Sequence, residues 1–393
     1  MALSDPKIIP NIPERLLMGP GPSPVSSSVR LAMAQPVLGH LDPAFLAIMD
    51  EVADHLRWVF GTENRLTLPL SGTGSAGMEA AVANWVQPGQ RVLVVAAGLF
   101  GQRLADAAAR QGGVVDVLEV PWGSALDAEQ LKDRLAQAPE PYAVVALVMA
   151  ETSTGVLQPM DGLSDLVHRH GALFLVDAVT AIGGMPVDVD RQGLDVVYAG
   201  TQKCLAVPPG LAPFSAGEAA LDILRQRPSP VPSWYLDLSM LERYWGGERF
   251  YHHTAPVSMI YALAEGLRRI RREGLDARFA RHRRASAALG AGLQAMGLSL
   301  VVDAAVRLFS LTTVYIPEGV DDAAVRGRLL NDFGIEIGGG LGPFRGRVWR
   351  IGTMGEGAQL EPVARVLSAL EATLHRTGGV EAAVASWGGA SGA

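Results

Sequence analysis

Lysine is scarce in this sequence, which narrows the search for an amine that could do chemistry. Of 33 basic residues only three are lysines, at Lys7, Lys132 and Lys203. Lys132 lies in the polar segment AEQLKDRL, typical of a surface helix, whereas Lys203 follows the apolar run LDVVYAGTQ. An amine at the carboxyl end of a buried strand is partly desolvated, which lowers its pKa and lets it attack an aldehyde. The alternative is a surface lysine in a loop.

A second apolar run, ALFLVDAV, stops abruptly at a carboxylate, Asp177. Burying that charge requires a partner. A protonated pyridine nitrogen is such a partner, because a ring held in that state accepts the electrons released when a substrate Cα loses its proton. A helix-capping or turn-forming aspartate is the alternative. Asp177 and Lys203 at two strand ends, with a phosphate site upstream, are more specific together than either is alone.

The segment SGTGSAG (residues 71–77) follows the apolar run RLTLPL and precedes a helical pattern. Free amides at that helix N-terminus can hold a phosphate. The glycines also satisfy G-x-G-x-x-G, the pattern of dinucleotide sites, which require an acidic residue about 20 positions further on. The next strand instead ends in Ala97-Gly98. This favours a site for a single phosphate, while a dinucleotide site and a structural turn remain open.

Short apolar runs alternate with helical patterns, which predicts an α/β fold. The strand candidates are RLTLPL, RVLVVAA, VVDVLEV, YAVVALVMA, ALFLVDAV and LDVVYAGTQ. Helices are expected at about 42–60, from 76, and at 101–111, 162–171, 257–274, 276–296, 321–331 and 359–375. The prediction is a large domain with a mostly parallel sheet of about seven strands flanked by helices, plus a smaller α+β C-terminal domain.

The chain of 393 residues exceeds the size at which one hydrophobic core usually stops growing. We expect an extended, proline-rich N-terminal arm at 1–22. The large domain is predicted at 23–256 and the small domain at 257–376. The Gly-rich end at 377–393 is predicted to be a flexible tail.

The composition, 49% hydrophobic and 19% charged, is that of a packed globular protein. A net charge of −7 without a dense Lys/Arg stripe argues against nucleic acid or a membrane as partner. The one cysteine, Cys204, fits a reducing compartment. No export signal or run of about 20 apolar residues is present, so a cytoplasmic location is expected.

Several motifs, in order along nearly the whole chain, resemble the alanine-glyoxylate/serine-pyruvate aminotransferase family, which are class V, fold-type I enzymes that use pyridoxal phosphate. They are MGPGPSPV, LGHLDPAF, SGTGSAGMEAA, GLFGQR, ETSTGVLQP, LVDAVTAIGGMPVDVDRQGLDVVYAGTQKCLAVPPG, YHHTAPV and GGGLGPFRGRVWRIGTMG.

The resemblance implies a role for each matching residue. Lys203 would carry pyridoxal 5'-phosphate as a Schiff base and shuttle the Cα proton, and Asp177 would pair with the ring nitrogen. Phe100, where close relatives have tryptophan, would still stack on the ring. The remaining cofactor contacts would come from Thr73, Gly74, Ser75, Thr152, Val179 and Gln202.

The resemblance also implies a homodimer with shared active sites. Tyr251 and Thr254, in YHHT, would reach the phosphate of the partner subunit. Arg350 would clamp the substrate carboxylate, for which a guanidinium fork is suited. The backbone of Gly21 would close over the substrate. No metal ion is expected.

The expected reaction is transamination from a small amino acid, alanine or serine, to glyoxylate or pyruvate. Aspartate and ureidoglycine remain alternative donors. A cysteine desulfurase needs a reactive cysteine on a mobile loop. It is disfavoured here because Cys204 lies next to Lys203 instead. Alternatives of another class are a nicotinamide-dependent dehydrogenase and a noncatalytic binding protein; the latter is disfavoured because lysine, aspartate, phosphate site and arginine are all present.

Overall fold

The computed structural model describes residues 12–389. Its strands are β1 (Leu16–Leu17), β2 (Leu66–Ser71), β3 (Arg91–Ala96), β4 (Val114–Glu119), β5 (Val144–Val148), β6 (Ala150–Glu151), β7 (Val156–Leu157), β8 (Leu173–Asp177), β9 (Val196–Tyr198), β10 (Leu211–Ala216), β11 (Leu311–Tyr315), β12 (Ile335–Glu336), β13 (Gly338–Gly339) and β14 (Val348–Gly352). Its helices are α1 (Ser27–Met33), α2 (Pro43–Phe60), α3 (Gly74–Trp85), α4 (Leu99–Arg110), α5 (Ala128–Ala136), α6 (Leu163–Arg169), α7 (Glu218–Arg225), α8 (Leu238–Trp245), α9 (Val257–Glu273), α10 (Leu275–Ala295), α11 (Asp322–Phe333), α12 (Leu360–Leu374) and α13 (Gly379–Gly389).

A seven-stranded sheet in the order β2-β10-β9-β8-β5-β3-β4 forms the centre of the fold. The pairs from β9 to β4 are parallel, and β10 runs antiparallel between β2 and β9. This confirms the predicted α/β fold with a mostly parallel sheet. The carboxyl ends of β3, β5, β8 and β9 therefore share one edge, where such sheets bind ligands.

One strand of the sheet, β10, was not among the predicted segments. Its sequence LAPFSA contains Pro213, and proline within a short run argues against a central strand because it lacks an N–H. The carbonyl of Pro213 nevertheless accepts a hydrogen bond from the Ala199 amide at 2.7 Å. The strand loses only the hydrogen bond that an N–H at position 213 would donate. The neighbouring residues of β10 complete the pairing with β2 and β9.

The sheet is buried on both faces, which explains its nearly continuous apolar strands. Val92 and Val94 of β3 belong to a core with residues of α3, α4 and α7. The alternate residues Leu93 and Val95 belong to a second core with residues of α2, α5 and α6. The predicted helices all form within two residues of the expected limits.

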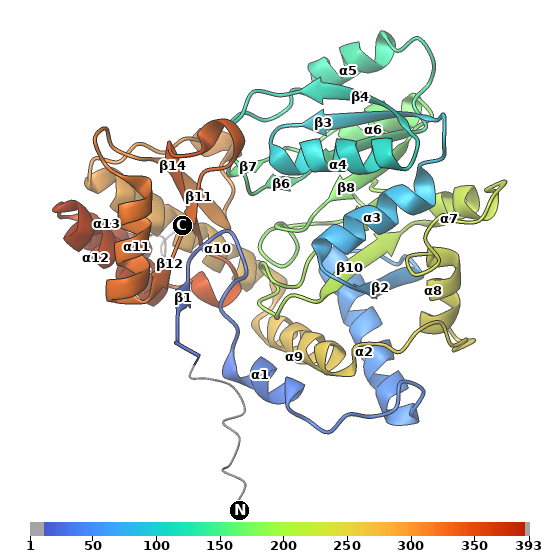
Figure 1. Ribbon diagram of the computed structural model, residues 1–393, viewed down its shortest axis with the longest axis horizontal. Helices are drawn as coiled ribbons and strands as arrows, with labels where there is room; N and C mark the ends of the chain where they lie inside the picture. Colours follow the sequence, from blue (N-terminus) through green and yellow to red (C-terminus); the bar gives the residue numbers. More distant parts are fainter. Residues whose placement is uncertain (1–11, 390–393) are drawn as a thin grey trace, which may run out of the picture.

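The C-terminal part of the chain, orange to red in Figure 1, lies beside the sheet and carries the smaller antiparallel sheet β11-β14-β13. From the N-terminal segment, β1 pairs in parallel with β12 of this part. The N-terminal segment is thus held against the C-terminal part of the chain through β1. The arm limits at 1–22 stay a prediction, and residues 1–11, with Lys7, lie outside the described residues. The domain limits at 23–256 and 257–376 stay predictions, and α9 packs against both α1 and α2.

The tail expected at 377–393 is not flexible throughout, because Gly379–Gly389 forms α13. Ala383 is fully buried in the core of α10 and α12. The Trp387 carbonyl accepts a hydrogen bond from Arg284 of α10 at 2.6 Å. The Gly-rich composition suggested disorder, but Ala and Val at helical spacing bury an apolar face, and tertiary packing outweighs the low helix propensity of glycine. Residues 390–393 lie outside the described part.

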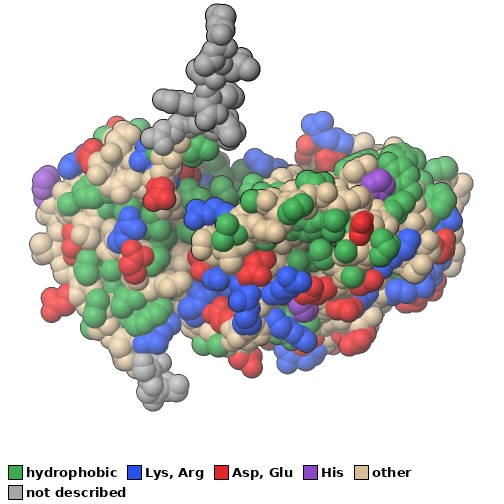
Figure 2. Space-filling view, turned by 90° about the horizontal axis from the view of Figure 1, so that it is seen from below, with side chains coloured by type: hydrophobic (Ala, Val, Ile, Leu, Met, Phe, Trp, Pro, Cys, Tyr) green, Lys and Arg blue, Asp and Glu red, His purple; other side chains and the backbone are tan. Residues whose placement is uncertain are grey.

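On the molecular face in Figure 2, Lys and Arg side chains are intermingled with Asp and Glu. The arginines of α9 illustrate this mixture: Arg268, Arg269 and Arg272 form ion pairs with Glu51, Glu356 and Glu265. Between residues 12 and 389, no helix combines the length and apolar character needed to cross a membrane.

Candidate active site

A cavity of about 170 Å³ lies at the carboxyl edge of the sheet. It brings together residues from α3, α4, the segment after β6, the end of β8 and the loop after β9. Eight of the predicted site residues line it: Gly74, Ser75, Phe100, Thr152, Asp177, Val179, Gln202 and Lys203.

Lys203 lies in the loop after β9, partly buried, and its ammonium donates a hydrogen bond to the Pro20 carbonyl. Desolvation and, to a smaller extent, the nearby Arg350 lower the pKa of Lys203 to about 8. A Cβ added to Gly21, which has a φ of +110°, would lie 2.6 Å from the lysine nitrogen. The arm therefore lies against the amine and leaves room only for glycine at position 21. The predicted closure of the Gly21 backbone over the substrate stays a prediction.

Asp177 is the last residue of β8 and only 3% exposed. Its Oδ1 accepts the Val179 N–H at 2.8 Å and its Oδ2 accepts the Tyr198 hydroxyl at 2.8 Å. Burial raises the pKa of Asp177 to about 7, although both hydrogen bonds favour the ionised form. The carboxyl group can thus hold or share a proton near neutral pH.

Sequence reasoning missed Tyr198, which is fully buried and orients Asp177 from the neighbouring strand. The two residues are direct partners in the β8–β9 register. A signal was present, since Tyr198 is a polar side chain near the end of an otherwise apolar run. Using it required the register of two strands, which the sequence alone does not give.

The start of α3 offers a phosphate site. Its N-cap residue, Thr73, is exposed and makes no side-chain capping bond, so the first helical amides are not closed off by that side chain. A Cβ on Gly74 would lie 2.9 Å from Val179, so glycine lets the helix start approach the cavity wall. Thr73 itself does not line the cavity.

Gln202 has a buried side-chain oxygen that lacks a hydrogen-bond partner within the described part of the chain. A buried amide without a partner is costly, and rotation of the amide exchanges its oxygen for an NH₂ donor. This group lines the same cavity as the first residues of α3, and it suits a phosphate oxygen as its acceptor. With an amine of lowered pKa, a proton-holding carboxyl and an aromatic ring, the residues present fit pyridoxal phosphate.

Arg350, in β14 of the C-terminal part of the chain, is 6% exposed and does not itself line the cavity, but it contacts Thr152, which does. Its Nε donates to the Gly339 carbonyl at 2.8 Å and its Nη1 to the Thr152 carbonyl at 2.9 Å. Burial lowers the pKa of Arg350 to about 10. Two backbone carbonyls fix the guanidinium and leave further donors for a carboxylate.

Tyr251 and Thr254 do not line the cavity of their own subunit. Tyr251 is 50% exposed, and its hydroxyl lies 3.5 Å from that of Thr254. Their segment is nevertheless anchored beside the glycine loop, because His253 Nε2 lies 2.7 Å from Ser71 Oγ. Their predicted role toward the partner subunit stays a prediction.

Cys204 is fully buried, and burial raises the pKa of its thiol to about 11. Its Sγ donates to the Thr180 carbonyl at 3.4 Å. A buried, protonated thiol is a poor nucleophile. This agrees with the expectation that Cys204 does not serve desulfuration.

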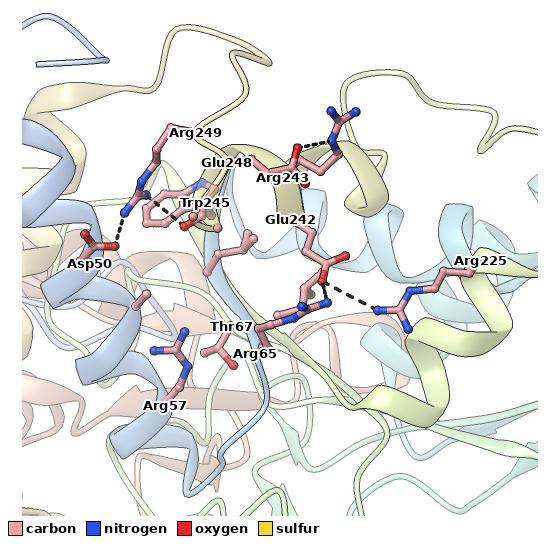
Figure 3. Close-up of a pocket in the computed structure, with 15 residues that line it drawn as sticks. Asp50, Arg57, Arg65, Thr67, Arg225, Glu242, Arg243, Trp245, Glu248 and Arg249 are labelled. Atoms are coloured by element: carbon pink, nitrogen blue, oxygen red, sulfur yellow. Dashed lines mark hydrogen bonds and ion pairs between the residues drawn. The ribbon is translucent and has the colours of Figure 1, made fainter.

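A larger cavity of about 690 Å³ lies elsewhere, between α2, β2 and α8 (Figure 3). Its wall is rich in arginine, but each guanidinium is paired with a carboxylate. Such pairs neutralise the charge that would attract an anionic ligand. The arginines are Arg57, Arg65, Arg225, Arg243 and Arg249.

Comparison with known proteins agrees with this site. The family model of aminotransferase class-V matches residues 32–342. The chain is 42% identical over 389 residues to (S)-ureidoglycine–glyoxylate transaminase of Bacillus subtilis, covering 94% of this chain and 93% of that protein. It is also 42% identical over 369 residues to alanine–glyoxylate aminotransferase of Callithrix jacchus, covering 93% and 89%.

The crystal structure of an alanine–glyoxylate aminotransferase from Nostoc sp. superposes with a TM-score of 0.92 at 47% identity, covering 95% of this chain and 100% of that one. The sequence comparison and the structure comparison point to the same family over nearly the whole chain. We therefore set aside the alternative that the glycine loop binds a dinucleotide. The chain belongs to the class-V aminotransferases, enzymes that transfer amino groups with pyridoxal phosphate.

Proposed function

We propose that this enzyme transfers the amino group of a small amino acid, alanine or serine, to glyoxylate or pyruvate. The observation that carries the proposal is the cavity that joins Lys203 and Asp177, with Arg350 fixed beside it. The relatives named above support glyoxylate as acceptor, because both carry it in their names.

The protein residues divide the work. Bound pyridoxal phosphate supplies an electron sink that stabilises negative charge at the substrate Cα. Lys203 Nζ, with its pKa near 8, can take and return the Cα proton close to neutral pH. Asp177 keeps a proton available to the ring nitrogen, and Arg350 binds and orients the substrate carboxylate. Gly21 and the arm exclude water above the amine.

An absorbance experiment tests this function. Purified protein with pyridoxal phosphate should show a band near the violet edge that bleaches with L-alanine or L-serine and returns with glyoxylate. The variant Lys203→Ala should lack the band, and the exposed-lysine control Lys132→Ala should keep it. If wild-type protein shows no band even with added pyridoxal phosphate, the proposed function is wrong.

The donor is a separate question, since the ureidoglycine transaminase of Bacillus subtilis and the alanine aminotransferase of Callithrix jacchus are each 42% identical to this chain. Ureidoglycine is therefore the second candidate donor, and aspartate the third. Comparing kcat/KM for alanine, serine, ureidoglycine and aspartate with glyoxylate as acceptor ranks them. An advantage of about tenfold or more for ureidoglycine would replace the first proposal.

We further propose a homodimer in which Tyr251 and Thr254 of one subunit complete the phosphate site of the other. Exposed aromatic side chains near this segment, Trp234, Phe250 and Tyr251, support a covered surface. Mixing inactive Lys203→Ala and Tyr251→Ala subunits should restore part of the activity, because one site of the mixed dimer is then complete. No recovery would place Tyr251 outside the partner's site. A cytoplasmic location stays a prediction.

A further inference from the structure

A buried carboxylate, Glu151, binds the first turn of α4 from a distant segment. Its Oε2 accepts hydrogen bonds from the amides of Phe100 at 3.2 Å and Gly101 at 3.3 Å. The side chain is 1% exposed. The N-cap residue of α4 is Gly98, which has no side chain to cap the helix. Glu151 therefore supplies the cap that the local sequence lacks.

Ser153 completes this contact. Its Oγ accepts the Leu99 amide at 2.9 Å and donates to Glu151 Oε1 at 2.5 Å, and its own amide donates to the same oxygen at 3.0 Å. Four donors thus converge on the carboxylate. Burial raises the pKa of Glu151, but a group surrounded only by donors is held as an acceptor, which is the ionised form.

The glycine at position 98 is explained by this contact. Its φ of 171° is extended backbone that any residue can adopt, so conformation does not require glycine there. Space does: a Cβ on Gly98 would lie 2.4 Å from Ser153 Oγ and 2.6 Å from Glu151 Cδ. The Gly98–Glu151 pair is therefore a fitted contact between GLFGQR and ETSTG.

Both segments joined by Glu151 touch the active site. On one side Phe100, whose amide Glu151 holds, lines the cavity. On the other, Thr152 lines the cavity and its carbonyl accepts the hydrogen bond that fixes Arg350. A shift of Glu151 would move the ring-stacking residue and the carboxylate clamp together.

We propose that Glu151 is a positioning residue that sets Phe100 for the cofactor and Arg350 for the substrate; this inference rests on the transaminase function proposed above. The geometry distinguishes it from a general stabiliser, because one of its hydrogen bonds ends on the cavity residue Phe100, and Thr152, the residue that follows Glu151, also lines the cavity. Glutamine has the same shape but carries an NH₂ group that cannot accept the donors around it, so one side of the contact fails.

The test compares Glu151→Gln with the exposed-carboxylate control Glu140→Gln, both with pyridoxal phosphate and L-alanine. For Glu151→Gln we expect the dissociation constant of pyridoxal phosphate, measured by equilibrium dialysis, and the KM for L-alanine each to rise about tenfold. The absorption maximum of the bound cofactor should also shift. Glu140→Gln should match wild type in all three.

The refuting result is a Glu151→Gln protein with lower thermal stability but unchanged cofactor affinity, absorption maximum and KM, since that describes a purely structural cap. Should Glu151→Gln fail to fold, Ser153→Ala decides: it keeps the charge and removes one bridge, so both constants should rise about threefold. Unchanged constants in Ser153→Ala overturn the inference. A wild-type protein that neither binds pyridoxal phosphate nor transaminates refutes the proposed function instead.

Discussion

Replacing Arg278 with methionine should destabilise the fold strongly. Arg278 of α10 is 2% exposed and joins α10 to the chain beside Lys203. Its Nε donates to the Gly183 carbonyl at 2.8 Å and its Nη2 to the Cys204 carbonyl at 2.5 Å. Its Nη1 pairs with Glu273 at 2.7 Å. Methionine fills a similar volume but donates to none of them.

The magnitude follows from the groups left behind. Each buried carbonyl without a partner costs about 1–3 kcal/mol, and Glu273 loses one of its two arginines but keeps Arg281. Relief of the buried charge of Arg278 offsets part of this loss. We expect the free energy of unfolding to fall by about 3 kcal/mol. The apolar side chain of methionine does not compensate for this loss, because the groups left without a hydrogen-bond partner are backbone carbonyls that stay in place.

Urea unfolding of the apoprotein, followed by far-UV circular dichroism, measures this change. The exposed Arg283 lies on the same helix over the Phe309 ring, so Arg283→Met is the matched control and should cost less than about 1 kcal/mol. If Arg278→Met costs no more than Arg283→Met, the two carbonyls do not depend on Arg278 and the argument fails.

Two further predictions concern single titratable groups. Asp177→Asn keeps a hydrogen-bonding side chain beside Tyr198 but cannot hold a proton for the ring, so steady-state kinetics should show kcat lower by about 10³-fold; a loss below about tenfold would contradict the role. Burial lowers the pKa of His282 to about 3, with Nδ1 donating to the Arg278 carbonyl and Nε2 accepting the Gly355 amide. From pH 6.5 down to about 3 only the unfolded state binds this proton, so folding loses stability as the pH falls. Over this range the free energy of unfolding of the wild type should fall by about 1.4 kcal/mol per pH unit more than that of His282→Gln. If urea unfolding at pH 7, 6 and 5 gives wild type and His282→Gln the same change in the free energy of unfolding with pH, the prediction is refuted.

The sequence was sufficient to predict those site residues whose place in the fold follows from their own strand or loop. Asp177 ends a strand, Lys203 follows the next strand in the sheet, and the glycine loop follows β2, so each could be placed at the sheet edge from its own segment. Parallel strands bring their carboxyl ends together, which made the cluster predictable. Gly21 and Arg350 came only from the resemblance, because their segments reach the site through the arm and β14.

What the sequence could not give depends on contacts between distant segments. Glu151 lies in the motif ETSTG, but its role needs α4, which lies about 50 residues earlier, as the separation of its partner amides shows. In α13, the helix forms because α10 offers an apolar surface, not because its own glycines favour it. Pro213 made the segment of β10 look unlike a strand, and the hydrogen bonds that nevertheless hold it in the sheet come from the neighbouring strands β2 and β9.

One physical cause, exclusion of water, prepares both titrating groups of the site. Burial disfavours charge, so it lowers the pKa of Lys203 to about 8 and raises that of Asp177 to about 7. Opposite shifts bring an amine and a carboxyl group toward the same pH, where each can exchange a proton. The neighbouring strands bury Asp177, and the arm around Gly21 lies against Lys203. Opening the cavity to water would return both groups to their ordinary pKa values, so the catalytic residues alone do not make this site; the segments that bury them are part of its chemistry.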